Sequence, residues 1–220
     1  MVTSIISLLA ALLLPALRKA RLQAGKSVCA SNLRQIGYGF YLYLQDFRET
    51  FPIARDPVST SPYYWLWMGR GWRSYLAPYI LRDISQDNPS ILYCPQDRTA
   101  PEKWESTSYA YSMSFYHSPR QINSMNDKSY TYASDKVMPS VPRRLSQVRY
   151  PSKKAIVGEW LSNHEPLEDD PGWWGWQGGR SYLFVDGHVE FISATRLLPA
   201  GDGYPDINLT INGIEGKDLP

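Results

Sequence analysis

The chain has 220 residues, which is enough for one globular domain of about 150–170 residues and an appendage. Hydrophobic residues make up 43% of the chain and charged residues 20%, which excludes a largely disordered protein. The net charge of +2 is too small to indicate nucleic acid as a partner.

Residues 1–17 form an uncharged, apolar run that basic residues follow at once. A secretory signal has basic residues before its apolar core, so a cleaved signal peptide is not expected here. The run is also shorter than the roughly 20 residues of a complete membrane span, and it matches a span that lacks its first turns. We expect Pro15 to kink the helix rather than end it, because membrane helices tolerate proline.

Apolar residues continue after this run at steps of mostly three or four, which predicts a single helix from about residue 2 to 49. At 1.5 Å per residue this helix would be roughly 70 Å long, too long for an ordinary globular domain. We therefore divide the chain into an apolar membrane or filament-core helix (1–17), its amphipathic continuation (18–50) and a globular β-rich domain (51–220). The predicted apolar face of the continuation consists of Leu17, Ala20, Ala24, Val28, Leu33, Ile36, Phe40, Leu44 and Phe47.

Short elements are predicted in the globular domain from alternation and from turn residues. A helix is expected at residues 72–80. Strands are expected within SILYCPQD (90–97), ending at Cys94 and Pro95, and at 108–116 and 154–160. Loops are expected at 51–62, at 118–126, at 137–144 and in the tail from residue 199, with one candidate strand at 207–211.

The clearest local signal is the hairpin YLFVDGHVEFI at residues 182–192, where apolar residues alternate on both sides of Asp186 and Gly187. Such an Asp-Gly pair predicts a two-residue type I′ turn. The elements together predict an α+β fold, in which one long helix packs on an antiparallel sheet.

The sequence contains no nucleophile motif, phosphate-binding loop or dinucleotide fingerprint, so no catalytic residue and no enzymatic activity are expected. His117, His164 and His188 are far apart and lack the spacing of metal ligands, and His188 is expected to lie on a surface strand. The acidic residues Glu168, Asp169 and Asp170 are candidates for calcium. Because they lack the alternating pattern of a calcium loop, a solvated loop is the favoured interpretation.

Three tryptophans, Trp173, Trp174 and Trp176, lie in a glycine-rich stretch. Exposed indole rings would stack on a sugar or on a neighbouring subunit, whereas buried rings would cap the sheet. Packing in the core or between subunits is favoured, and ligand contact is the alternative. A second aromatic group, expected in the core, consists of Trp65, Trp67 and Trp72.

Cys29 and Cys94 are the only cysteines, and two cysteines cannot build a four-ligand zinc site by themselves. One interpretation is a disulfide between the helix and a strand that ends at Cys94, worth about 3–4 kcal/mol. The other is a pair of buried thiols. The sequence leaves both open.

The stretches LLAALLLPALRKAR (8–21) and CASNLRQIGYGFYLYLQDF (29–47) resemble the N-terminal region of type IV pilin-like proteins. They are most similar to the major-pseudopilin-like proteins of type II secretion whose C-terminal domain bears a His-x9-Asp-Gly motif. Cys29 and the segment Asn32–Gly37 match that group. The similarity continues in order at residues 91–97, 108–114, 145–157 and 182–192.

Two features of that group differ in this chain. Trp176 occupies the position of the motif's histidine, so the role of that histidine is not carried over. The basic leader, the glycine cleavage site and the glutamate that pilins carry are not found before the apolar run. We expect that the sequence begins inside the natural mature protein or that the protein has lost this processing.

The resemblance implies a structural, non-enzymatic subunit of a type IV pilin-like filament or of a type II secretion pseudopilus. Its N-terminal helices would assemble into the filament core through Leu8, Leu9, Leu12, Leu13, Leu14 and Pro15. The expected partners are copies of the same chain, other pilins and the secretion or pilus assembly proteins. Calcium, in a C-terminal loop, is the one cofactor that the resemblance suggests.

The implied location is the bacterial inner membrane with a periplasmic domain, and later a periplasmic or extracellular filament. The main alternative is a membrane-anchored protein that does not polymerise and binds polysaccharide through its tryptophan loop. An anchored hydrolase is a weaker alternative, because no catalytic motif supports it.

Overall fold

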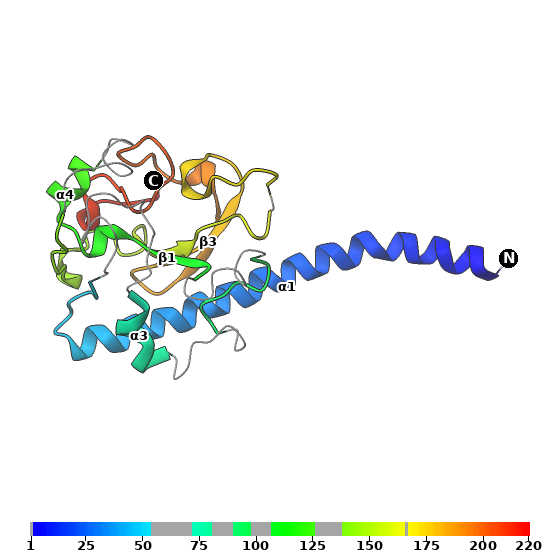
Figure 1. Ribbon diagram of the computed structural model, residues 1–220, viewed down its shortest axis with the longest axis horizontal. Coiled ribbons are helices and arrows are strands. Elements are labelled where there is room, and N and C mark those ends of the chain that lie inside the picture. The colour runs from blue at the N-terminus through cyan, green and yellow to red at the C-terminus, as the bar shows by residue number, and fades with distance from the viewer. Residues whose placement is uncertain (1, 54–71, 81–89, 98–106, 126–137, 166) are drawn as a thin grey trace.

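The computed structural model describes residues 2–53, 72–80, 90–97, 107–125, 138–165 and 167–220, with the backbone alone at 2–10 and 12. The first element is a single long helix, α1 (Val2–Asp46), which continues through Pro15. Its first half projects away from the rest of the protein, and its second half lies along the globular part (Figure 1). The prediction of one continuous helix is confirmed, although the helix ends before residue 49. Arg48 and Glu49 adopt positive φ angles of 52° and 59°, which turn the chain out of the helix.

The second half of α1 buries one face against the domain. Leu33, Ile36 and Phe40 on this face are at most 1% exposed, as the apolar stripe predicts. Further towards the N-terminus the predicted stripe is wrong, because Val28 is 47% exposed while Cys29 is fully buried. At 3.6 residues per turn, position 29 lies about 40° around the helix from position 33, whereas position 28 lies about 140° from it.

Four antiparallel strands form the sheet in the order β1-β2-β3-β4, which confirms the α+β class. Val157 of β2 and Leu183 of β3 pair in the register and share the hydrophobic cluster that contains the buried face of α1. Tyr182 and Phe184 belong to a second cluster, on the opposite face, which the C-terminal segments cover. The strands are β1 (Tyr109–Tyr111), β2 (Ala155–Glu159), β3 (Gly179–Phe184) and β4 (Val189–Ser193).

A short helix, α3 (Trp72–Ile80), packs on the second half of α1 and confirms the helix predicted there. Trp72 is fully buried, and its ring stacks on Phe40 with 5.7 Å between the ring centroids. The core position predicted for Trp72 is therefore confirmed. Trp65 and Trp67 lie outside the described residues.

The β3–β4 hairpin is confirmed, but its turn differs from the prediction. The backbone amide of Phe184 donates to the carbonyl of His188, so three residues rather than two form the loop. Within this turn only Gly187 has a positive φ, at 89°. A type I′ turn needs a positive φ at both of its central residues. The side chain of Asp186 instead accepts a hydrogen bond from the amide of His188, which stabilises this wider turn.

Of two predicted strands, one is absent and the other is shorter than expected. In both places polar side chains form hydrogen bonds with the nearby backbone. Residues 91–97 form turns instead of a strand. Strand β1 ends at Tyr111, because the hydroxyl of Ser112 caps a 3₁₀ turn at Met113–Phe115. A strand at residues 155–159, within the predicted 154–160, is confirmed as β2.

Two loop predictions also need correction or refinement. The segment 118–126 was expected to be a loop but holds the helix α4 (Pro119–Ser124), which Ser118 and Gln121 stabilise as a capping box. The tail after residue 199 is irregular as predicted, but its candidate strand at 207–211 is wrong. This segment forms turns, and the amide of Asn208 bonds to the side chain of Asp206 two residues earlier.

A buried ion pair attaches the C-terminal tail to the start of β2. Lys154 and Asp218 are 0% and 5% exposed at their side chains, and Nζ lies 3.1 Å from Oδ2. The ammonium group also bonds to the hydroxyls of Thr210 and Ser114. Asp218 in turn accepts from the backbone amide of Ala155 at 2.8 Å, so each charge has several partners.

Candidate functional site

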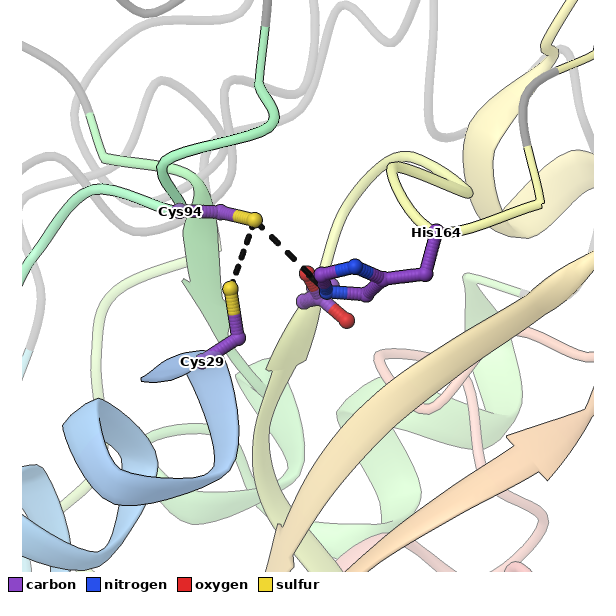
Figure 2. Close-up of side chains that lie close together, drawn as sticks. Cys29, Cys94 and His164 are labelled. Atoms are coloured by element: carbon purple, nitrogen blue, oxygen red, sulfur yellow. Dashed lines mark hydrogen bonds and ion pairs between the residues drawn. The ribbon is translucent and has the colours of Figure 1, made fainter. Parts of the chain in front are cut away.

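Four buried side chains meet at the junction between α1 and the sheet, and we call them the Cys–His–Glu cluster: Cys29, Cys94, Glu159 and His164. One ligand atom from each lies within 4.8 Å of all the others. The two Sγ atoms are 2.6 Å apart, and Sγ of Cys94 is 3.6 Å from Nε2 of His164. The same nitrogen lies 3.0 Å from Oε1 of Glu159. Figure 2 shows the two sulfurs and the His164 ring pointing into one space.

Gly25, one helical turn before Cys29 on α1, leaves room for the side chain of Gln96 against the helix. A Cβ at position 25 would lie 2.4 Å from the amide carbon of Gln96. The amide nitrogen of Gln96 donates to the backbone carbonyl of Arg21 at 3.0 Å, which docks this segment onto the helix.

Cys94 belongs to a turn formed by the sequence Cys-Pro-Gln-Asp. The amide of Asp97 donates to the carbonyl of Cys94 at 3.0 Å, with Pro95 at the second position, where turns favour proline. The hydroxyl of Ser108 accepts from the amide of Cys94 at 2.9 Å and donates to the carboxylate of Asp97 at 2.7 Å. The turn is therefore held firmly, and it presents Cys94 and Gln96 to α1.

Glu159 is the last residue of β2, and the alternation of the strand directs it to the same face as Val157. That face is covered by α1, so the carboxylate points towards the helix. Oε2 accepts from the backbone amide of Ser181 at 2.8 Å, which leaves Oε1 directed at His164.

His164 follows β2 in a tight loop that folds back over the sheet. The hydroxyl of Ser162 donates to the carbonyl of Glu165 and accepts from the amide of Gly179, which closes the loop. The imidazole bonds through Nδ1 to the amide oxygen of Gln96. This bond orients the ring so that Nε2 faces Cys94 and Glu159.

The two sulfurs have opposite electrostatic environments. A hydrogen bond from Cys94 lowers the pKa of Cys29 to about 7 against the opposing effect of burial, and a hydrogen bond to His164 also lowers it. The same hydrogen bond, together with burial, raises the pKa of Cys94 far above its ordinary value. Near neutral pH, Cys29 is therefore the thiol that deprotonates first.

The acid and the imidazole stabilise each other's charged forms. Burial alone would lower the pKa of His164, but hydrogen bonds to Cys29 and Glu159 raise it to about 9. Burial would raise the pKa of Glu159, yet the hydrogen bond and the charge of His164, with the amide of Ser181, lower it. The cluster thus combines an ionised carboxylate, an imidazole and two thiols in a space closed to water.

This donor set supports two kinds of chemistry. Two thiolates, an imidazole and a carboxylate are all zinc ligands. Two adjacent thiols can also be oxidised to a disulfide. Both cysteines are present as free thiols, so the Cys29–Cys94 disulfide stays a prediction.

The sequence pattern singles out the two cysteines but does not indicate the residues that join them in space. His164 and Glu159 lie 70 and 65 positions after Cys94, far outside any local ligand spacing. One signal was present, because Glu159 ends the apolar strand AIVGE at a position whose alternation makes it inward-facing.

The tryptophan stretch is mostly packed into the domain. Trp173 is fully buried, and its indole nitrogen donates to the carbonyl of Glu159 at 2.8 Å. Trp174 stands edge-on to Trp160 with 4.8 Å between the ring centroids. Trp176 is 37% exposed. These positions agree with packing as the main role of Trp173 and Trp174.

The acidic residues proposed for calcium do not converge. Asp170 pairs with the buried guanidinium of Arg180 at 2.7 Å and also accepts from the amides of Ser162 and Gly172. Glu168 and Asp169 are exposed. Within the part of the chain that the structure describes, the Cys–His–Glu cluster is the one group with three or more converging His, Cys, Asp or Glu ligands. Calcium binding stays an untested prediction.

His188 lies beside the hairpin turn, apart from the Cys–His–Glu cluster. Its side chain is 38% exposed, Nδ1 lies 2.5 Å from the carboxylate of Asp186, and its ring stacks on Phe184. His117 is buried elsewhere in the domain. The structure therefore brings only one of the three histidines to the cysteines.

The residues proposed for assembly lie on the projecting half of α1. Leu13 and Leu14 are 59% and 65% exposed, and Leu17 is 56% exposed. The side chains of Leu8, Leu9 and Leu12 lie outside the described residues. Among the described residues, no helix combines the length and apolar character needed to cross a membrane.

Comparison of the chain with protein-family models, with characterised proteins and with solved structures found no match.

Proposed function

We propose that the protein is a structural subunit of a type IV pilin-like filament or a type II secretion pseudopilus and assembles through α1. The observation that carries this proposal is the projecting half of the helix, on which Leu13, Leu14 and Leu17 are each more than half exposed. Exposed apolar surface costs about 25 cal/mol for each Å². Copies of the same helix, or lipid before assembly, would remove that cost.

The part of α1 that lies on the domain supports the same proposal. Its outer face carries large side chains that the domain leaves uncovered, with Tyr38 at 68%, Tyr41 at 61% and Leu42 at 43% exposure. Their spacing of three and four residues places them on one side of the helix. A neighbouring subunit in a helical assembly would contact such a side, because head-to-tail contacts that do not close produce filaments.

The alternative of a polysaccharide-binding protein receives less support. Sugar-stacking sites need flat aromatic surface open to solvent, whereas Trp173 is buried and Trp174 packs edge-on against Trp160. Trp176 alone offers partly exposed surface in this stretch. We therefore propose assembly rather than ligand capture as the main function.

The test is the double substitution Leu13→Asp and Leu14→Asp in the full chain. Charges on the projecting helix should reduce filament formation at least tenfold, measured by electron microscopy and sedimentation, while circular dichroism shows a folded domain. The matched control is Ile211→Asp, which changes a side chain on the globular part that is 53% exposed. Normal filaments from the double variant, or a wild-type protein that stays monomeric without detergent, would contradict the proposal.

A further inference from the structure

We propose that the Cys–His–Glu cluster is a structural zinc site, in which Cys29, Cys94, Glu159 and His164 bind one Zn²⁺ and join α1 to the domain. The two sulfurs, one nitrogen and one oxygen make a complete four-ligand set. All four side chains are buried, which fits a closed structural site rather than a catalytic one with an open position. This inference is independent of whether the chain forms filaments.

One pair of donor atoms already has the separation found around tetrahedral zinc. Zn–S and Zn–N bonds of about 2.3 and 2.0–2.1 Å place sulfur and nitrogen about 3.6 Å apart. Sγ of Cys94 and Nε2 of His164 are separated by 3.6 Å. The sulfurs, now 2.6 Å apart, would separate by about 1 Å to reach the tetrahedral spacing. Binding of Zn²⁺ would therefore require the two cysteine side chains to rotate apart.

The surroundings of His164 and Glu159 match the outer contacts that orient zinc ligands. A zinc-bound histidine commonly donates its second nitrogen to an oxygen, which fixes its tautomer. Here Nδ1 bonds to the amide oxygen of Gln96, whose nitrogen is held by the carbonyl of Arg21. The carboxylate of Glu159 is held by the amide of Ser181, which keeps Oε1 directed towards the cluster.

The composition of the cluster favours zinc over the other outcomes. A disulfide uses the two sulfurs and does not require a buried carboxylate and imidazole directed at them. A hard cation such as calcium or magnesium prefers oxygen ligands, whereas soft thiolates favour zinc. On binding, Zn²⁺ takes the place of the protons on the two sulfurs and on Nε2 of His164, and these protons leave to solvent.

The site would connect four segments that are distant in sequence. Cys29 belongs to α1, Cys94 to the turn that docks on it, Glu159 to the end of β2 and His164 to the following loop. A metal bonded to all four would fix the angle at which the long helix leaves the domain. Such cross-linking of distant segments stabilises the folded chain against the unfolded one.

The experiment measures zinc on the full chain, purified in detergent under reducing conditions and freed of unbound metal. We expect about one zinc per chain by elemental analysis. Replacing zinc with Co²⁺ should give the visible bands of tetrahedral cobalt and a thiolate charge-transfer band in the near ultraviolet. Cys94→Ser, which leaves Cys29 as the one thiolate, should lose about half of that charge-transfer intensity and lower zinc affinity at least tenfold.

Milder variants keep the test independent of folding. Glu159→Gln and His164→Gln should each lower zinc affinity about tenfold or more, and Gln96→Ala, which removes only an outer contact, should lower it about 10- to 100-fold. The matched control is His188→Gln, since His188 also pairs with a carboxylate but lies on the surface away from sulfur. This variant should bind zinc as the wild type does.

Two results would overturn the proposal. One is a reduced, folded wild-type protein with two titratable thiols that binds less than about one-tenth of an equivalent of zinc. The other is zinc binding that Cys94→Ser and His164→Gln leave unchanged, because the metal would then lie elsewhere. Loss of binding in the cluster variants alone, with the control intact, supports the site.

Discussion

At the scale of single residues, Asp206 is a carboxyl group buried in a place that disfavours its charge. Burial, together with the nearby carboxylate of Asp202, raises its pKa to about 8. Hydrogen bonds from the amide of Asn208 and the side chain of Trp174 oppose this rise without cancelling it. Its Oδ2 atom has no hydrogen-bond partner among the described residues. The folded protein therefore holds a proton there at neutral pH.

This proton makes stability depend on pH in a defined direction. In the unfolded chain the carboxyl titrates near its ordinary value of 3.8, so between about pH 4 and 8 the folded state binds more protons. The free energy of unfolding must then fall as pH rises through that window. We expect the wild type to lose stability relative to Asp206→Asn between pH 4 and 8, measured by urea unfolding. A difference that stays flat or grows would show that Asp206 is ionised in the folded protein.

At the scale of elements, α1 shows how one helix serves two environments. Leu33 on its inner face is fully buried in the main cluster, whereas Leu42 on its outer face is 43% exposed. The same residue type therefore performs different roles within three turns. The inner positions hold the helix to the sheet, and the outer ones remain exposed.

The same substitution at these two positions separates the roles. Leu33→Ala should cost about 2–5 kcal/mol of unfolding free energy, because it removes a buried side chain and leaves a cavity. Leu42→Ala should cost about 1 kcal/mol or less. Both values come from denaturant unfolding of the monomer in detergent. Equal losses would mean that the inner face of α1 does not contribute to the core as the structure shows.

At the scale of the whole molecule, the C-terminal tail is attached through charge rather than through regular structure. Asp218 brings the end of the chain back to the start of β2, where Lys154 is fully buried. The amide of Asp218 also donates to the carbonyl of Lys153 at 2.7 Å. The tail then covers the sheet face opposite α1, with Leu219 in the second hydrophobic cluster.

Removing one partner should reveal how much this attachment contributes. Asp218→Ala leaves the ammonium of Lys154 buried without a carboxylate, and we expect a loss of about 3–5 kcal/mol in unfolding free energy. The matched surface pair is Arg149 and Glu215, whose side chains are 67% and 33% exposed. Glu215→Ala should cost about 1 kcal/mol or less in the same urea titration. A loss for Asp218→Ala as small as that control would show that water reaches Lys154.

The sequence by itself determined the elements that depend on local interactions. The helix α1 follows from apolar residues at helical spacing over a segment whose single proline is tolerated. The β3–β4 hairpin follows from alternation, and β2 follows from a short apolar stretch. In these elements the conformational preference of each residue agrees with the hydrophobic pattern of its neighbours in sequence. The pattern along the chain is therefore sufficient to predict them.

Tertiary structure decided the places where a side chain competes with the backbone or meets a distant segment. The hydroxyls of Ser112 and Ser118 accept hydrogen bonds from backbone amides two and three residues later. These local bonds end strand β1 before Ser112 and begin helix α4 after Ser118. His164 and Glu159 joined Cys29 and Cys94 only through the sheet register and the packing of α1. A local sequence pattern cannot predict this cluster, because its four residues come from separate segments that only the tertiary structure brings together.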